Sequence, residues 1–362
     1  MRIGGRDIVL PTTMVGSWPR PLWMRGGVLR ESTEGLDYPD MHQRTLFEDA
    51  VRLCVKDQEL AGLDLVVDGN QYFQGETPYD KIQMLLVPLR LQGFRAYGPP
   101  GTVPGMEHYF RPIVAERIRW VRPIFGAVLA AMKQATDGPF KININSGPAA
   151  VASWCHDEYY GDPATLREDI ATAFNTELRW LADHGAEFIQ LTEQTYLGYG
   201  GREQWPLELM NRVTDGVRAH LTWHMCYGNA REFETSYPEV NAGCLGTLFT
   251  GDQPIDWTEI HLETARPKMA ELDVLGRWVE RGGDYLGIGV VEVMNPHVET
   301  PEEVADRLRA ALKHVPAERL IVSTDCGLYQ LPRDVAFRKL CSLVAGTRLV
   351  RRELGAATDG TS

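Results

Sequence analysis

The sequence predicts an α/β fold, namely a (β/α)8 TIM barrel with a β-rich insertion after its second strand. Apolar runs of strand length occur eight times along the chain, and stretches with helical periodicity lie between most of them. Polar residues gather at the expected carboxyl ends of these strands, where barrels of this class build their functional sites. Strands that alternate with helices indicate a parallel sheet, and eight such units can close a barrel. We therefore expect a single domain over residues 1–354.

Each expected strand is a short apolar run that ends at or near a polar residue. In chain order these strands are Thr12–Ser17, Leu65–Asn70, Phe140–Ser146, Phe188–Glu193, His220–Cys226, Trp257–Glu263, Gly287–Glu292 and Leu320–Cys326. The helices expected between them are Leu46–Ala61, Pro163–His184, Leu207–Val217, Ala265–Arg281 and Pro301–Leu312. Thr300 supports the start of the last helix, because threonine can cap a helix and proline is tolerated in the first turn.

Two segments do not fit the barrel repeat. The interval from about Tyr79 to Gly105 contains an expected strand, Leu85–Leu91, and an expected turn, Tyr97–Gly101. We interpret it as an insertion after the second barrel strand, either a flap over the rim or a surface hairpin with no role in function. The last residues, 355–362, are expected to form a disordered tail.

Composition and charge restrict the partners. The formal charge of −12 and the lack of a dense Lys/Arg stripe argue against binding to nucleic acid or to an anionic membrane. No run of about 18 apolar residues and no segment like a signal peptide occurs, so we expect a cytoplasmic protein. Its six cysteines are widely scattered, unlike a disulfide framework, which leaves reduced thiols for a metal. A homo-oligomer is compatible with the sequence.

His224, Cys226 and Cys326 have the side chains of a zinc site. Alternate residues of a strand face the same way, so His224 and Cys226 can share one tetrahedral ion. Cys326 ends another expected strand, and Glu263 supplies a carboxylate at the equivalent place on a third. The alternative is that the two cysteines are small core residues and His224 is an interior imidazole with satisfied hydrogen bonds.

Several motifs, taken in their order along the chain, resemble the C-terminal catalytic barrel of cobalamin-independent methionine synthases. These motifs are LPTTMVGSWP at 10–19, VDG at 67–69, SGP at 146–148 with Trp154, Ile189-Gln190 with Glu193, HMCYGN at 224–229, Leu262-Glu263, GIGV at 287–290 and DCGL at 325–328. In that family zinc is held by His, Cys, Glu and Cys. The resemblance thus implies Zn²⁺ bound by His224, Cys226, Glu263 and Cys326.

The resemblance also implies a reaction. In the family the substrate thiol joins the zinc, and the resulting thiolate attacks a methyl group carried by a folate nitrogen. A free thiol has a pKa near 8.5, so only a few per cent is ionised at pH 7, a deficit of about 2 kcal/mol that metal coordination removes. Small-molecule partners follow from this, namely a thiol and a methyl or alkyl donor.

Two departures concern the thiol. The family has a glutamate at the position of Asn70 and an aspartate at the position of Thr192, and both bind the homocysteine ammonium group. Losing the two carboxylates removes two charge-assisted hydrogen bonds, each worth roughly 1.5 to 3 kcal/mol. Ser17 and Glu193 are retained as substrate-binding candidates, and Glu193 also as a catalytic one. A thiol without an ammonium group fits this set better than homocysteine does.

A third departure concerns the donor. The family often carries a histidine that is proposed to protonate the leaving folate amine, and Met294 stands in its place. His297 lies three residues further on and is the candidate replacement for the general acid. Trp154 matches a tryptophan beside the pterin and could contact a flat donor. Without the acid, a better leaving group is favoured, such as a methylcorrinoid, a sulfonium or quaternary ammonium, or an epoxide.

Three functional hypotheses remain after these departures. The first is a zinc-dependent thiol methyltransferase or alkyltransferase whose substrates are not the standard homocysteine and methylfolate. The second is a thiol transferase that opens an epoxide, like the coenzyme M transferases that share this zinc scaffold. The third is a barrel that binds zinc or a thiol without catalysis. A catalytic zinc exchanges one ligand, whereas structural zinc keeps four protein ligands, so thiol entry into the metal shell discriminates between them.

Overall fold

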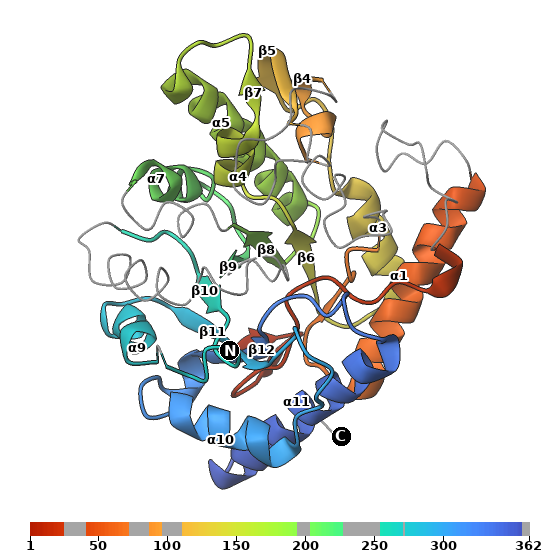
Figure 1. The fold of residues 1–362 in the computed structure, drawn as a ribbon, viewed down its shortest axis with the longest axis vertical. Helices are drawn as coiled ribbons and strands as arrows, with labels where there is room; N and C mark the ends of the chain where they lie inside the picture. Colours follow the sequence, from red (N-terminus) through yellow and green to blue (C-terminus); the bar gives the residue numbers. More distant parts are fainter. Residues whose placement is uncertain are drawn as a thin grey trace.

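The computed structural model describes residues 1–24, 41–71, 87–95, 111–193, 203–226, 254–270 and 272–356. Its centre is a curled sheet of seven parallel strands in the order β12-β11-β10-β9-β8-β6-β3 (Figure 1). The strands are β3 (Val66–Val67), β6 (Phe140–Ile144), β8 (Phe188–Thr192), β9 (His220–Met225), β10 (Glu259–Leu262), β11 (Tyr285–Val291) and β12 (Leu320–Thr324). Seven of the eight expected strands are thereby confirmed, each within a few residues.

The eighth expected strand, Thr12–Ser17, is reduced to one bridge that joins the two ends of the sheet. Thr12 pairs in parallel with Val322 of β12, and its carbonyl oxygen accepts a hydrogen bond from the backbone N–H of Leu65, just before β3. The Thr12 N–H donates to the Asp64 carboxylate (2.9 Å), so this N–H is not used in a hydrogen bond to a neighbouring strand. The sheet therefore curls round on itself in a manner consistent with a TIM-like barrel.

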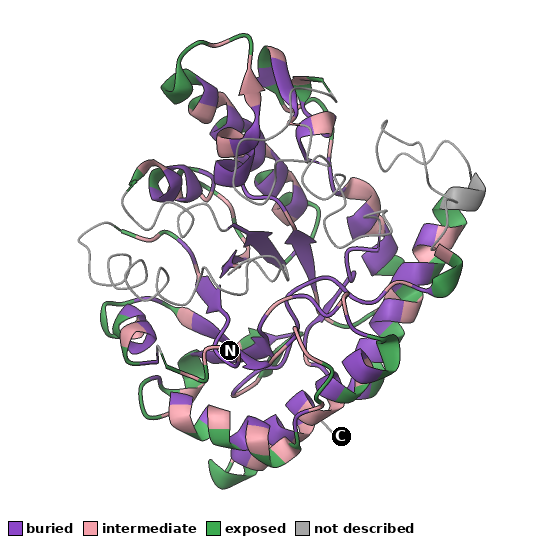
Figure 2. Cartoon of the chain, viewed as in Figure 1, coloured by how far each residue is buried: buried purple, intermediate pink, exposed green. Residues whose placement is uncertain are grey.

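The helices lie around the outside of the sheet (Figure 1). They are α1 (Met41–Ala61), α3 (Gly126–Ala135), α4 (Pro148–Trp154), α5 (Pro163–Asp183), α7 (Trp205–Arg212), α9 (Leu272–Glu280), α10 (Pro301–Ala311) and α11 (Arg333–Glu353). Their apolar sides face the buried sheet, whereas their outer sides are exposed (Figure 2). Among the described helices, none has both the length and the apolar character needed to cross a bilayer.

The five expected helices are all present, although one starts later than expected. Helix α9 begins at Leu272 rather than Ala265, because the backbone N–H groups of residues 264–266 donate to the Asp325 carboxylate instead. Helix α10 begins as expected, with a capping box in which Thr300 accepts from the Glu303 N–H and Glu303 accepts from the Thr300 N–H. Helices α3, α4 and α11 were not expected from the sequence.

Two small β structures lie outside the barrel sheet. The hairpin of β1 (Arg2–Ile3) and β2 (Arg6–Asp7) packs Ile3 against Leu65 and Phe188, at the amino-terminal end of the barrel strands. A second sheet contains β4 (Gln92–Arg95), β5 (Ile113–Arg119) and β7 (His156–Asp157). It lies beside α5 in Figure 1.

Only part of the expected insertion can be compared with the structure. The strand expected at Leu85–Leu91 is wrong over 87–90, which are helical. Pro88 argues against the strand, because it has no N–H for a sheet ladder. Strand β4, at 92–95, lies within the expected interval. The turn at 97–101 and residues 357–362 of the expected tail lie outside the described residues, so the flap stays a prediction.

A buried ion pair ties α11 to the loop after β11. The Lys339 ammonium donates to Glu299 (2.9 Å), and both side chains are at most 1% exposed. Lys339→Met should lower the free energy of unfolding by about 3 kcal/mol, because it leaves the Glu299 carboxylate buried without its main counter-charge. Urea unfolding tests this, with Arg309→Met as the control, since Arg309 pairs with Glu353 at the surface. Equal losses in the two variants would contradict the prediction.

Candidate metal centre

Polar side chains occupy alternate positions on the parallel strands, where they meet inside the curled sheet. All of these side chains are buried: Lys141 and Asn143 of β6, Gln190 and Thr192 of β8, Thr222 and His224 of β9, and Glu259 and His261 of β10. Hydrogen bonds connect neighbouring strands, for example between Thr222 and Glu259 (2.7 Å). A polar interior differs from the branched apolar layers usual in such barrels. We therefore expect the interior to serve a site as well as the fold.

His224, Cys226 and Cys326 form a cluster at the carboxyl ends of the strands. Their candidate ligand atoms all lie within 4.8 Å of one another. Cys226 directly follows β9 and Cys326 lies two residues after β12, so the curl of the sheet brings these separated strand ends together. None of the five cysteines among the described residues is in a disulfide. The structure thus brings these three of the four expected ligand residues together.

The distance between the two sulfur atoms fits a shared zinc ion. Cys226 Sγ and Cys326 Sγ lie 3.8 Å apart. Two Zn–S bonds of about 2.3 Å at the tetrahedral angle separate their sulfurs by about 3.8 Å. A disulfide, by contrast, has its sulfur atoms about 2.0 Å apart. The donor set and its spacing therefore suit zinc.

The imidazole of His224 also has one nitrogen left for a metal. His224 Nδ1 lies 2.8 Å from His261 Nδ1, whereas His224 Nε2 is buried and has no hydrogen-bond partner in the described part of the chain. Burial lowers the pKa of His261 well below its usual value, so His261 is neutral and can accept the His224 Nδ1 proton. With His261 Nδ1 as the acceptor, this hydrogen bond leaves a lone pair on His224 Nε2, as a metal ligand requires.

Glu263 is fully buried and directly follows β10, but its carboxylate is not one of the three groups in the cluster. Its loop is tied to that of Cys326 by Asp325, whose carboxylate accepts hydrogen bonds from the N–H groups of Thr264, Ala265 and Arg266 (2.8–2.9 Å). We did not expect this role for Asp325 from the sequence. Its place immediately before a candidate ligand was the available signal.

Two of the expected substrate-binding residues have a buried polar atom without a hydrogen-bond partner among the described residues. Thr192 is the register partner of His224 on the adjacent strand, and its Oγ1 has no hydrogen-bond partner among the described residues. The Nε1 atom of Trp154, at the end of α4, is likewise buried and has no hydrogen-bond partner among the described residues. Buried polar atoms without partners are rare in native structures and often mark a site that a ligand completes.

Ser17 and Asn70 lie close together at the same end of the sheet. Asn70 Nδ2 donates to Ser17 Oγ (3.0 Å). Ser17 is packed against the Cys326 loop, since a Cβ placed on Gly327 would lie 2.8 Å from Ser17 Cβ. The structure therefore brings the expected pair of residues together, next to a candidate metal ligand.

The two expected catalytic residues, Glu193 and His297, are not among the three residues of the metal cluster. The Glu193 carboxylate accepts a hydrogen bond from the Ala150 N–H (2.7 Å) in the first turn of α4, so it holds the helix that carries Trp154. His297 has a side chain that is 59% exposed, 3.3 Å from the Glu303 carboxylate, and it is not part of the metal cluster. Met294 is half-buried against the core. The catalytic roles of Glu193 and His297 stay predictions.

Comparison with known proteins gives consistent matches over nearly the whole chain. Residues 10–348 match the family described as cobalamin-independent synthase, catalytic domain. Methionine synthase from Sulfurisphaera tokodaii is 31% identical over 347 residues (96% of this chain and 94% of the relative), and that from Saccharolobus solfataricus is 34% identical over 349 residues (96% of each).

Solved structures agree with these matches. A B12-independent methionine synthase from Shewanella sp. W3-18-1, in complex with selenomethionine, superimposes with a TM-score of 0.80 at 26% identity and covers 97% of this chain and 100% of that one. A structure from Listeria monocytogenes has a TM-score of 0.69 at 18% identity and covers 95% and 99% of the two chains, which shows likeness of fold alone.

Proposed function

We propose that the protein is a zinc-dependent enzyme that transfers a methyl or alkyl group to the sulfur of a small thiol. The proposal proceeds from the family: the chain belongs to the cobalamin-independent methionine synthases. Membership supports methyl transfer as the class of reaction. The observation that carries zinc dependence is the 3.8 Å separation of Cys226 Sγ and Cys326 Sγ beside His224. Glu263 is the proposed fourth ligand, at the end of the strand next to that of His224.

The residues of the site would favour an electron-rich sulfur. When bound, zinc would ionise the substrate thiol at neutral pH, which removes a deficit of about 2 kcal/mol. Two ionised cysteines and the Glu263 carboxylate carry three formal negative charges, which exceed the two positive charges of the ion. Such a donor set favours attack by sulfur on an alkyl group over hydrolysis. His261 fixes His224 in the tautomer that suits this role.

The substrate is proposed to differ from homocysteine. Asn70 and Thr192 stand where the resemblance places the two carboxylates that bind an ammonium group. An amide and a hydroxyl supply no charge to such a group, so a thiol without an ammonium group should bind better. Both residues are buried at the strand ends, and Glu193 holds the first turn of α4, the helix that ends at Trp154.

The donor is proposed to have a better leaving group than a folate amine. Met294 cannot donate a proton, and His297 is exposed and paired with Glu303. The same observation favours a second candidate, thiol-driven opening of an epoxide, because relief of ring strain reduces the need for a strong general acid. The acidic role of His297 is retained as a proposal that His297→Gln would test through the rate of transfer.

Zinc X-ray absorption with and without thiol tests the proposal. The zinc-loaded protein should gain one metal–sulfur bond when thiol is added. Incubation of several thiols with methylfolate, methylcobalamin, a methyl sulfonium or an epoxide should then give one alkylated thiol, identified by product mass. If no added sulfur enters the metal shell, the protein binds zinc without this chemistry and the proposal is wrong.

A further inference from the structure

The start of helix α11 is anchored on helix α1 by a bidentate ion pair. Arg333, the first residue of α11, donates from Nε to Oδ2 of Asp57 (2.6 Å) and from Nη2 to Oδ1 (2.7 Å). The Asp57 carboxylate is buried, whereas Arg333 is partly exposed. Two parallel N–H···O bonds fix both the distance and the orientation of a guanidinium group. The loop that leads into α11 therefore ends at a fixed point.

The same carboxylate also holds the chain that follows the first barrel segment. Trp18 is buried, and its Nε1 donates to Asp57 Oδ2 (3.1 Å). The Trp18 backbone N–H donates to the Gly69 carbonyl (3.0 Å), in the turn after β3. An indole N–H needs an acceptor when it is buried, and removal of the Asp57 carboxylate would take that acceptor away. Asp57 thus joins three separate parts of the chain.

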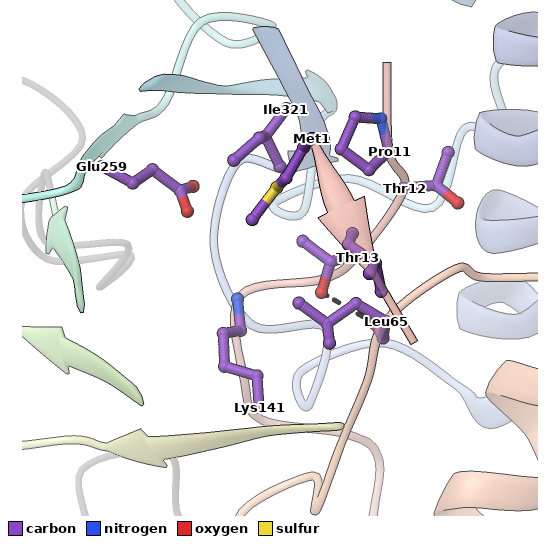
Figure 3. A pocket seen from close by; sticks show the side chains of 9 residues that line it. Met1, Pro11, Thr12, Thr13, Leu65, Lys141, Glu259 and Ile321 are labelled. Carbon is purple, nitrogen blue, oxygen red and sulfur yellow. Dashed lines mark hydrogen bonds between the residues drawn. The ribbon is translucent and has the colours of Figure 1, made fainter. Parts of the chain in front are cut away.

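Side-chain hydrogen bonds hold the join between the first barrel segment, Thr12–Ser17, and β3, which we call the barrel seam. At its amino end Thr13 Oγ1 donates to the Leu65 carbonyl (2.9 Å), as Figure 3 shows. Further along, the Gln58 side chain of α1 accepts from the Val67 N–H (2.9 Å) and donates to the Val67 carbonyl (2.7 Å). A regular ladder would use these backbone groups to pair two strands. Side-chain contacts therefore help to set how the barrel seam closes.

The loop between Cys326 and Arg333 is held at three points. Its beginning is tied to the loop after β10, three of whose backbone N–H groups donate to the carboxylate that precedes Cys326. In its middle, the Leu328 N–H donates to the backbone carbonyl of Ser17 (2.7 Å), at the barrel seam. Its end is Arg333, on the Asp57 carboxylate. Because Ser17 directly precedes the tryptophan that Asp57 holds, Asp57 supports two of the three points.

We propose that Asp57 is a positioning residue for the metal centre, which sets the place of the Cys326 sulfur through Trp18 and Arg333. It acts from α1 and is not itself a ligand. The inference rests on the proposed function, because it takes Cys326 as a zinc ligand. A zinc site needs its ligand atoms within about 0.2 Å of their ideal distances from the ion. A loop released at two of its three points should therefore hold the ion less tightly.

Two variants release the loop, and a third is the matched control. Asp57→Asn removes the charge and one of the two acceptor oxygens, because an amide N–H₂ cannot accept from Arg333 or from Trp18. Arg333→Met removes only the fixed point at the start of α11. Glu353→Gln breaks a bidentate pair of the same kind, which joins Glu353 to Arg309 at the surface. Only the first two variants should affect the metal centre.

Zinc affinity is measured by competition with a chelator, and the geometry of the centre by the absorption of the Co²⁺-loaded proteins. In Asp57→Asn zinc affinity should fall about threefold to tenfold, which is less than the roughly 10–100-fold cost of losing a direct partner of a ligand. In Arg333→Met it should fall by a smaller factor. The sulfur-to-cobalt absorption should shift in both variants. The control should match the natural protein in both measurements.

Amide hydrogen exchange separates positioning from a general effect on stability. In Asp57→Asn the exchange of the Leu328 and Trp18 N–H groups should speed up by a larger factor than that of β8, because both groups lie at the released points. A role in stability alone would speed the exchange of β8 at least as much. It would also leave zinc affinity and cobalt absorption unchanged as long as the protein remains folded.

Unchanged zinc affinity and cobalt absorption in folded Asp57→Asn would overturn the inference and leave the proposed function intact. If Asp57→Asn does not fold, Arg333→Met decides, because Arg333 is partly exposed and its replacement leaves the bond from Trp18 in place. Unchanged zinc affinity in that variant would then overturn the inference. If the natural protein binds no zinc, the proposed function fails and this inference fails with it. Circular dichroism confirms that each variant folds.

Discussion

Cys226→Ser should abolish stoichiometric zinc and the transfer of alkyl groups to thiol. The serine hydroxyl is a poor ligand for zinc at neutral pH, and one of the two sulfurs 3.8 Å apart is lost. The fall in zinc affinity should exceed the roughly 10–100-fold cost of losing an outer partner of a ligand. Metal analysis of the purified protein and product formation measure the two effects. Cys326→Ser should behave alike.

Cys341→Ser is the matched control for these variants. Cys341 is a free, half-buried thiol on α11, outside the cluster, so its replacement should leave zinc content and transfer unchanged. Full zinc occupancy in either Cys226→Ser or Cys326→Ser would show that the two sulfurs do not hold the metal.

Asp325→Asn should destabilise the protein and weaken zinc binding together. The Asp325 carboxylate accepts three backbone N–H bonds, so an amide must point its own N–H₂ at one of these donors. We expect a loss of about 2–4 kcal/mol in the free energy of unfolding, because the facing N–H is buried and left unsatisfied. Zinc affinity should fall about 10–100-fold, since the loops of Glu263 and Cys326 lose their connection.

Urea unfolding and zinc competition with a chelator measure the two effects of Asp325→Asn. Asp334→Asn serves as the control, because Asp334 is exposed on α11 and, among the described residues, its carboxylate pairs with Arg338 alone, one helical turn away. Neither quantity should change in the control. A stable Asp325→Asn protein with unchanged zinc affinity would show that these hydrogen bonds do not organise the site.

The strand ends could be predicted because apolar runs of fixed length repeat along the chain. Placing His224 and Cys226 at the end of one run and Cys326 at the end of another was enough to group them. The sequence does not predict the helix at 87–90, because the apolar run that contains Pro88 has the length and composition of a strand. Short apolar runs do not distinguish the two structures by periodicity alone.

The partners inside the sheet were missed for a different reason. His261 meets His224 only through the register of β9 and β10, which the sequence does not contain. The alternation of Lys141 with Asn143, two residues apart on one strand, was a signal for a polar inner face. Neighbouring apolar residues concealed it, because the same run satisfied the pattern of a buried strand.

The two candidate sulfur ligands come from β9 and β12, with β10 and β11 between them. A zinc ion bound by both cysteines would cross-link the ends of these two strands at the carboxyl end of the barrel. Zinc binding would then stabilise four neighbouring strands against separation. The unfolding temperature of the protein would therefore rise with the concentration of free zinc. A shortage of zinc would thus lower the amount of the protein as well as its activity, since the zinc-free form would unfold and be degraded more readily.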